Sequence, residues 1–136
     1  MHALEEVRRV VQKDGWLLDI RPMASKPPLE LAFGDEIQFA GEIDDSAWVL
    51  DEELVNDALE IVFARGDFLK ERVGRFKLST YWDTLDEFAS WADENWDDVL
   101  IPENTLENAT KIMEQDERKF KIRVTYTMLI GRYRKS

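Results

Sequence analysis

The chain has 136 residues, of which 44% are hydrophobic and 11% aromatic, so we expect a single domain over residues 1–136 with its own core. The absence of cysteine excludes a disulfide framework, a zinc–thiolate site and a cysteine nucleophile. A formal net charge of −11 repels nucleic acid and anionic membrane surfaces, and with no signal peptide or long apolar run the expected location is cytoplasmic.

The first part of the chain predicts a helix, a strand and a hairpin. Ala3–Asp14 carry apolar side chains at helical spacing, and Gly15 follows where a helix C-cap is expected. Trp16–Ile20 is an apolar run that predicts a short buried strand. Leu29–Ile43 alternate around a Gly34-Asp35 turn, as in a β-hairpin.

A second helix and two long strands are predicted next. The helix is expected over Asp51–Arg65, ended by Gly66. Its apolar stripe consists of Leu54, Val55, Ala58, Ile61 and Val62. Phe68–Thr80 and Lys119–Tyr133 alternate as strands do.

Two further helices lie between these strands. A Thr-x-x-Glu capping box at Thr84–Glu87 opens one that ends near Trp96. The other begins after Pro102, with Asn104 and Glu107 as the expected cap pair. The predicted fold class is α/β (α+β): a small mixed, largely antiparallel sheet with helices packed on it.

Positive charge gathers near the C-terminus, against the acidic balance of the chain. The residues are Arg118, Lys119, Lys121, Arg123, Arg132, Arg134 and Lys135. A solvated strand face followed by a tail accounts for them, and contact with an anion is the alternative.

No set of residues predicts catalysis by this chain alone. His2 is the only histidine and lies at the terminus, so no serine has a histidine partner within a plausible triad. The six glycines are scattered, which excludes a phosphate-binding loop. Helix starts and solvated faces account for the acidic clusters. We therefore predict no catalytic, cofactor-binding or metal-binding residue, and favour a non-enzyme for the isolated chain.

Aromatic residues are the remaining candidates for a ligand site or an interface. They are Trp16, Trp48, Tyr81, Trp82, Trp91 and Trp96. Core packing explains such residues in most domains, and a shallow aromatic pocket or an interface patch is the alternative, because Trp and Tyr dominate binding hot spots.

One segment resembles a known family. Ala3–Val11, then Asp14-Gly15, then Trp16–Pro22 resemble the helix, turn and fifth strand of class I SAM-dependent methyltransferases of the type 11-like group. Lys13-Asp14-Gly15 stands where that family usually has a Pro/Asp-Gly-Gly turn. The resemblance implies that the chain holds strands five, six and seven of the family's sheet, in the spatial order 5-7-6, plus a β-hairpin.

The resemblance also implies that the cofactor-binding half is missing. In the family, SAM binds a Gly-rich loop and an acidic residue on strands one and two, and no position here corresponds to them. SAM is expected only if a missing half is supplied. Strand five, Trp16–Ile20, would lose its neighbour and become an apolar edge. Pairing with a second copy about a two-fold axis, or coverage by the hairpin Leu29–Ile43, would protect it.

Three functions are consistent with these observations. The first is an uncharacterised methyltransferase-like domain without its own SAM site, acting by self-association or by completing a partner chain. The second is the substrate-binding C-terminal portion of a methyltransferase. The third is a small-molecule binding domain with a Trp-rich pocket. The expected partner is a homodimer copy or a complementing protein chain.

Overall fold

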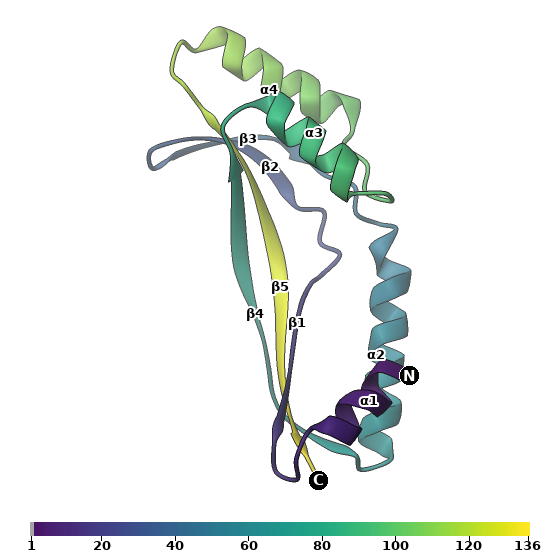
Figure 1. Cartoon of the computed structure of the whole chain (residues 1–136). Helices are drawn as coiled ribbons and strands as arrows, with labels where there is room; N and C mark the ends of the chain where they lie inside the picture. Colours follow the sequence, from purple (N-terminus) through teal and green to yellow (C-terminus); the bar gives the residue numbers. More distant parts are fainter. Residues whose placement is uncertain (1) are drawn as a thin grey trace. The chain divides into compact units, whose positions relative to one another are not determined.

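The computed structural model describes residues 2–136, which form four helices and five strands (Figure 1). In chain order these are α1 (His2–Val10), β1 (Trp16–Pro22), β2 (Pro28–Phe33), β3 (Glu36–Glu42), α2 (Trp48–Ala64), β4 (Phe68–Trp82), α3 (Leu85–Asn95), α4 (Glu103–Gln115) and β5 (Lys121–Lys135). The fold is mixed α/β with an open antiparallel sheet, as the sequence predicts.

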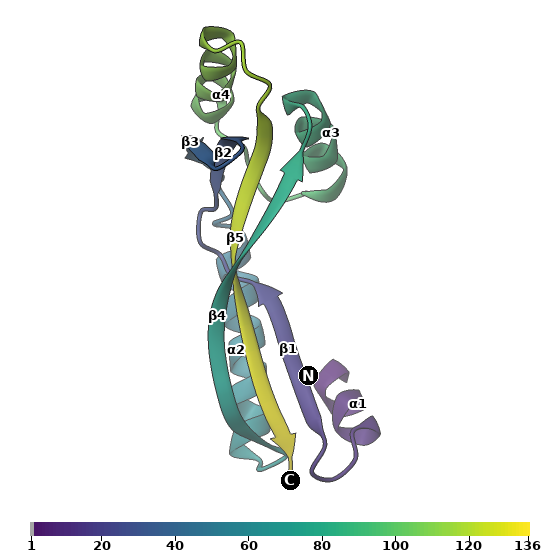
Figure 2. The same cartoon turned by 90° about the vertical axis from the view of Figure 1, so that its left-hand side faces the viewer.

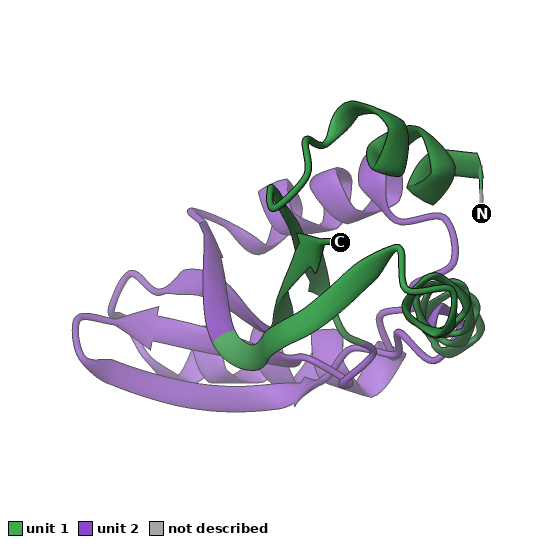
Figure 3. Ribbon diagram, turned by 90° about the horizontal axis from the view of Figure 1, so that it is seen from below, with its two compact units in different colours: residues 1–23, 49–76, 128–136 green, residues 24–48, 77–127 purple. Residues whose placement is uncertain are grey.

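The chain divides into two compact units, coloured separately in Figure 3. Unit 1 comprises residues 1–23, 49–76 and 128–136, and unit 2 comprises residues 24–48 and 77–127. The boundary falls inside β4 and inside β5, so each of these strands contributes to both units. That residues 1–136 form one domain stays a prediction.

In unit 1, strand β5 lies between β1 and β4. β1 pairs with β5 antiparallel, from Trp16 opposite Arg134 to Pro22 opposite Met128 (Figure 2). β4 pairs with β5 as well. A small core of Leu59, Val62, Phe68 and Tyr133 joins α2 to this sheet, and α1 packs against the same core.

The turn between α1 and β1 differs from the prediction. α1 ends at Val10, earlier than the predicted Asp14, and the left-handed residue is Asp14 with φ +63°, not Gly15. The backbone N–H of Asp14 donates to the carbonyl of Lys135, and that of Lys135 donates to Gly15. β1 is therefore held to β5 as soon as it begins.

Helix α2 begins earlier than predicted and buries a different stripe. It starts at Trp48, and its buried residues are Leu59 and Val62. Of the predicted stripe, Leu54, Val55 and Ile61 are exposed, so only part of the stripe is correct. The helix is apolar on several sides, which makes its inward face hard to read from spacing alone. Its end is as predicted: Gly66 adopts φ +74° and donates to Phe63.

Unit 2 contains the predicted hairpin and two helices. Gly34 has φ +59° in the turn between β2 and β3, and β2 pairs with residues Lys121–Val124 of β5. The register shifts between Leu29 and Glu30, which leaves Ala40 without a partner on β2 and forms a β-bulge beside Gly41. The core of unit 2 is built on fully buried side chains, which include Leu29, Leu31, Phe88, Phe120 and Ile122.

The caps of the two helices in unit 2 differ in kind. The predicted capping box is present, because Glu87 N–H donates to Thr84 Oγ1 at 3.1 Å and the Glu87 carboxylate accepts from Asp83 N–H. The cap predicted at Asn104 is wrong. α4 begins at Glu103 and its N-cap is Pro102, which makes no side-chain cap bond because the proline ring has no hydrogen-bonding group.

Candidate functional site

Strand β1 is an edge strand of the sheet in unit 1. It pairs with β5 on one side, and no other strand among residues 2–136 pairs with it. The hairpin named as a cover does not pair with β1, since β2 pairs with β5 instead. Alternate backbone N–H and C=O groups of an edge strand point away from the sheet and can pair with a strand of another chain.

The side chains of β1 alternate between a covered and an open face. Leu17, Asp19 and Arg21 are half-buried on the side of α1 and α2. Trp16, Leu18 and Ile20 point the other way and are 57%, 56% and 54% exposed. The prediction of a buried strand over Trp16–Ile20 is therefore wrong for three of its five residues, because the helices of unit 1 cover only one face of the sheet.

A groove runs along β1 between α1 and α2. Its volume is about 510 Å³. Its lining is almost wholly apolar: Ala3, Leu4, Leu17, Leu18, Asp19, Ile20, Leu54, Val55, Ala58 and Leu59. α1 lies beside β1, on the side away from β5 (Figure 2), and the lining residues of the groove come from α1, β1 and α2. An apolar segment with a free backbone ladder fits this geometry.

A second groove lies on the open face, where β1, β5 and β4 meet. Its volume is about 430 Å³. The lining is Leu18, Arg72, Gly74, Arg75, Phe76, Ile130 and Arg132. Gly74 forms part of it without a side chain, and a Cβ built there would meet only Ile130 Cγ2, at 3.9 Å. The groove is therefore lined by three apolar side chains, Leu18, Phe76 and Ile130, and by three arginines.

The arginines of this face are in two different states. Arg132 is paired: its Nε lies 2.9 Å from Glu71 Oε2, and its guanidinium lies 5.1 Å from the centre of the Trp16 ring. Arg134 pairs with the other oxygen of Glu71. Within residues 2–136, the side chains of Arg72 and Arg75 make no hydrogen bond, ion pair or ring contact. Two guanidinium groups beside an apolar groove are therefore unpaired.

The helix-covered face of the same sheet is closed by internal contacts. Arg21 donates from Nη2 to Asn56 Oδ1 at 2.8 Å and pairs with Asp19 at 3.1 Å. Burial, aided by nearby Asp19, raises the pKa of Tyr133 above its usual value. Arg21 is therefore paired, and the cavity on this face is smaller, at about 320 Å³, with Arg21, Asn56 and Tyr133 in its lining.

The candidate tryptophans fall into two groups. Trp82, Trp91 and Trp96 pack against one another and against Phe88 in unit 2, with ring centres 4.8–5.9 Å apart. Trp48 is also partly buried against this core. Tyr81 is half exposed, and Trp16 alone lies on the open face of unit 1.

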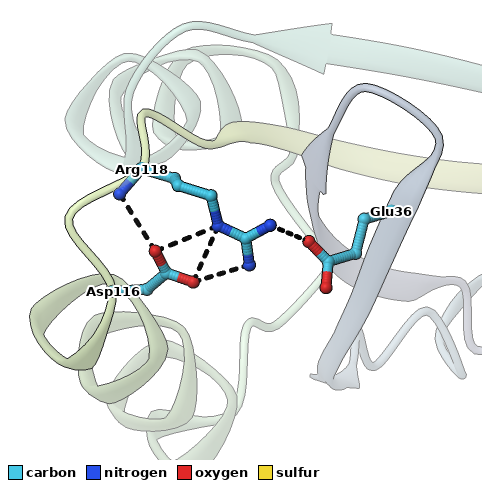
Figure 4. A network of polar contacts seen from close by, with 3 residues as sticks. All are labelled: Glu36, Asp116 and Arg118. Carbon is cyan, nitrogen blue, oxygen red and sulfur yellow. Dashed lines mark hydrogen bonds and ion pairs between the residues drawn. The ribbon is translucent and has the colours of Figure 1, made fainter.

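The most connected polar cluster in unit 2 joins Arg118, Asp116 and Glu36 (Figure 4). The Arg118 guanidinium also stacks over the rings of Phe33 and Phe120, at 5.1 and 5.3 Å. Hydrogen bonds from Arg118 lower the pKa of Asp116. Every charge in this cluster has a partner, so it fastens the end of α4 to the hairpin and offers no free group for a ligand.

Sequence reasoning named Trp16 but missed Leu18, Ile20, Arg72 and Arg75. The alternation of side chains along a strand was the available signal for Leu18 and Ile20, because every second residue of a strand lies on the same face as Trp16. No local signal places Arg72 and Arg75 beside Ile130, since they meet only when β4 pairs with β5.

Within residues 2–136, no three histidine or carboxylate side chains come together as a metal ion would require. None of the helices in the same range is both long enough and apolar enough to span a bilayer. Comparison with models of protein families, with curated proteins and with solved structures found no match for this chain.

Proposed function

We propose that this chain is an assembly domain with a methyltransferase-like strand arrangement, and that it joins a further protein chain through β1. The observation that carries the proposal is the apolar edge strand, whose Trp16, Leu18 and Ile20 are each more than half exposed. Exposed apolar side chains gathered on one strand mark an interaction surface, because isolated soluble domains rarely leave such patches open.

The strand order supports the methyltransferase-like part of the proposal. β5 lies between β1 and β4 and runs antiparallel to β1. That is the order 5-7-6 which the resemblance of residues 3–22 implies. In the family's strand order, strand four is the neighbour of strand five. The corresponding place in this chain is the free side of β1, where the groove lined by Leu4, Leu17 and Leu54 lies.

Completion by a partner also explains why the exposed edge is tolerable. An apolar edge strand is a template for aggregation unless something pairs with it or covers it. A partner that adds a strand at β1 would satisfy its outward backbone groups and bury apolar surface at ~25 cal/mol per Å².

Site-specific photo-crosslinking tests the proposal in the cell. A photoreactive residue at position 18 should give one discrete covalent adduct with a protein chain, while one at position 10 should give none. Val10 is a matched control, because it is 62% exposed on α1 and lines neither groove. Equal adducts at both positions, or none at either, would count against an assembly surface on β1.

Titration with S-adenosylmethionine separates this proposal from a self-sufficient methyltransferase. The isolated chain should release no heat with the cofactor in a calorimeter. The complex with a partner identified by crosslinking should bind it, if that partner supplies the cofactor half. Micromolar binding by the isolated chain would contradict the proposal.

A further inference from the structure

The open face of the sheet in unit 1 adjoins the edge of β1 and shares Trp16, Leu18 and Ile20 with it. It carries Trp16, Leu18 and Ile20 from β1, Ile130 and Arg132 from β5, and Arg72 and Phe76 from β4. In layered domains a sheet face of this kind is covered by helices or by another sheet. α1 and α2 cover only the opposite face, since Leu59 and Val62 pack with Tyr133, which alternates with Arg132 and Arg134 along β5.

The charge on this face is opposite to that of the chain. Arg72, Arg75, Arg132 and Arg134 meet one acid there, Glu71, whereas the whole chain has a net charge of −11. Arg72 and Arg75 remain unpaired within residues 2–136. A partner that buries the apolar centre would therefore need carboxylates at the rim, because an unpaired charge at the edge of a buried surface costs affinity.

A second copy of the chain fits this face poorly. Placing two open faces together would bring the arginine rims against each other, and like charges at an interface repel. The acidic, apolar outer side of α2, which includes Leu50, Asp51 and Leu54, is the complementary surface on another copy. This side of α2 lies on the opposite side of the sheet from the open face. Each copy that bound through it would therefore present its own open face to the next copy, and the result would be an open chain of copies and not a closed dimer.

We propose that the open face binds an acidic amphipathic helix from a different protein chain. Its apolar stripe lies over Leu18, Ile130 and Phe76, and its flanking carboxylates pair with Arg72 and Arg75. Gly74 lets the helix approach the sheet closely, since no side chain stands there. This inference rests on the proposed assembly function and names the partner's chemistry.

The probe is a pair of synthetic helical peptides with the same leucine stripe, flanked by glutamate in one and by lysine in the other. Each peptide carries a fluorescent label, and its anisotropy reports binding, because the chain's own fluorescence comes from five tryptophans. The glutamate peptide should bind the full chain, with affinity that falls as salt rises, and the lysine peptide should bind at least tenfold more weakly.

Two variants test whether the peptides bind to the open face. The double substitution Arg72→Glu and Arg75→Glu should reverse the preference, so that the lysine peptide binds better than the glutamate peptide. The control, Lys111→Glu with Lys119→Glu, makes the same change in net charge on unit 2 and should leave the preference unchanged. Gly74→Leu should fill part of the groove and weaken the binding of both peptides, and a Cβ at this position meets only Ile130 Cγ2, at an ordinary contact distance of 3.9 Å.

The outcomes separate this inference from the proposed function. Equal binding of both peptides, or a preference unaffected by the charge reversal, would overturn the acidic helix while leaving assembly through β1 in place. A dimer in light scattering that buries Trp16 would also overturn it, because a second copy would then be the occupant. If neither peptide binds and crosslinking at position 18 also fails, both the inference and the proposed function are wrong.

Discussion

Neighbouring leucines on β1 should differ sharply in their contribution to stability. Leu17 faces the core of unit 1, and Leu18 faces the open side, where it is 56% exposed. Fully burying a leucine side chain contributes about 1.5–3 kcal/mol to the free energy of unfolding. Leu18 buries less than half of its surface, so its contribution should be about 1 kcal/mol or less. Leu17 also supports packed neighbours, so its loss leaves a cavity and should cost about 2–3 kcal/mol.

Threonine at each position makes the comparison fair, because a β-branched residue keeps the preference for a strand. Leu18→Thr should leave the urea midpoint almost unchanged, whereas Leu17→Thr should lower it clearly at constant m-value. A loss of more than about 2 kcal/mol for Leu18→Thr would refute the assignment of an open face, since it exceeds what a half-exposed leucine contributes. Light scattering on the same samples would show whether self-association buries Leu18.

Three further predictions concern packing, capping and pH. Gly41→Ala should destabilise the chain by about 1–3 kcal/mol in urea unfolding, because its Cβ would lie 2.3 Å from Thr105 Oγ1, and adding Thr105→Ala should recover part of the loss. Thr84→Ala should cost about 1 kcal/mol through the lost cap of α3, seen as a lower melting temperature than in Asp83→Ala. Burial raises the pKa of Tyr126 to about 12. Its phenol therefore ionises more readily in the unfolded chain, so that stability should fall from about pH 10 to about pH 12, and denaturant titrations of Tyr126→Phe should show a shallower fall.

Elements defined by local chemistry were predictable from the sequence. The hairpin turn at Gly34, the helix end at Gly66 and the capping box at Thr84 each depend on a few adjacent residues. Both glycines adopt positive φ, a conformation that glycine reaches at little cost, so their positions mark the turns directly.

What the sequence did not reveal is which face of an element is covered. Trp16–Ile20 reads as a buried run because four of its five residues are large and apolar, yet coverage depends on where α1 and α2 pack. In α2, apolar residues occur on several sides, so spacing favoured Leu54 and Ile61 as well as Val62. Tertiary packing buries Val62 and Leu59, and the predicted stripe did not include Leu59. Burial of a strand face is set by distant segments, and only the assembled sheet shows it.

The aromatic candidates illustrate the same limit. Trp82, Trp91 and Trp96 are close in sequence and contact one another, so their clustering was readable from the chain. Their role was not, because core and pocket tryptophans share the same composition and differ only in what surrounds them. Trp16, which looked like the core residue of a buried strand, is the one on the open face.

Hydrogen exchange of β1, with and without the partner that crosslinks at position 18, tests the central claim most directly. The account predicts that the amides of Trp16–Pro22 exchange more slowly in the complex, because the partner pairs with the free edge. β3 (Glu36–Glu42) is the matched control, since it ends the strand order on the other side and should be unaffected. Unchanged exchange in β1 upon binding would contradict the account.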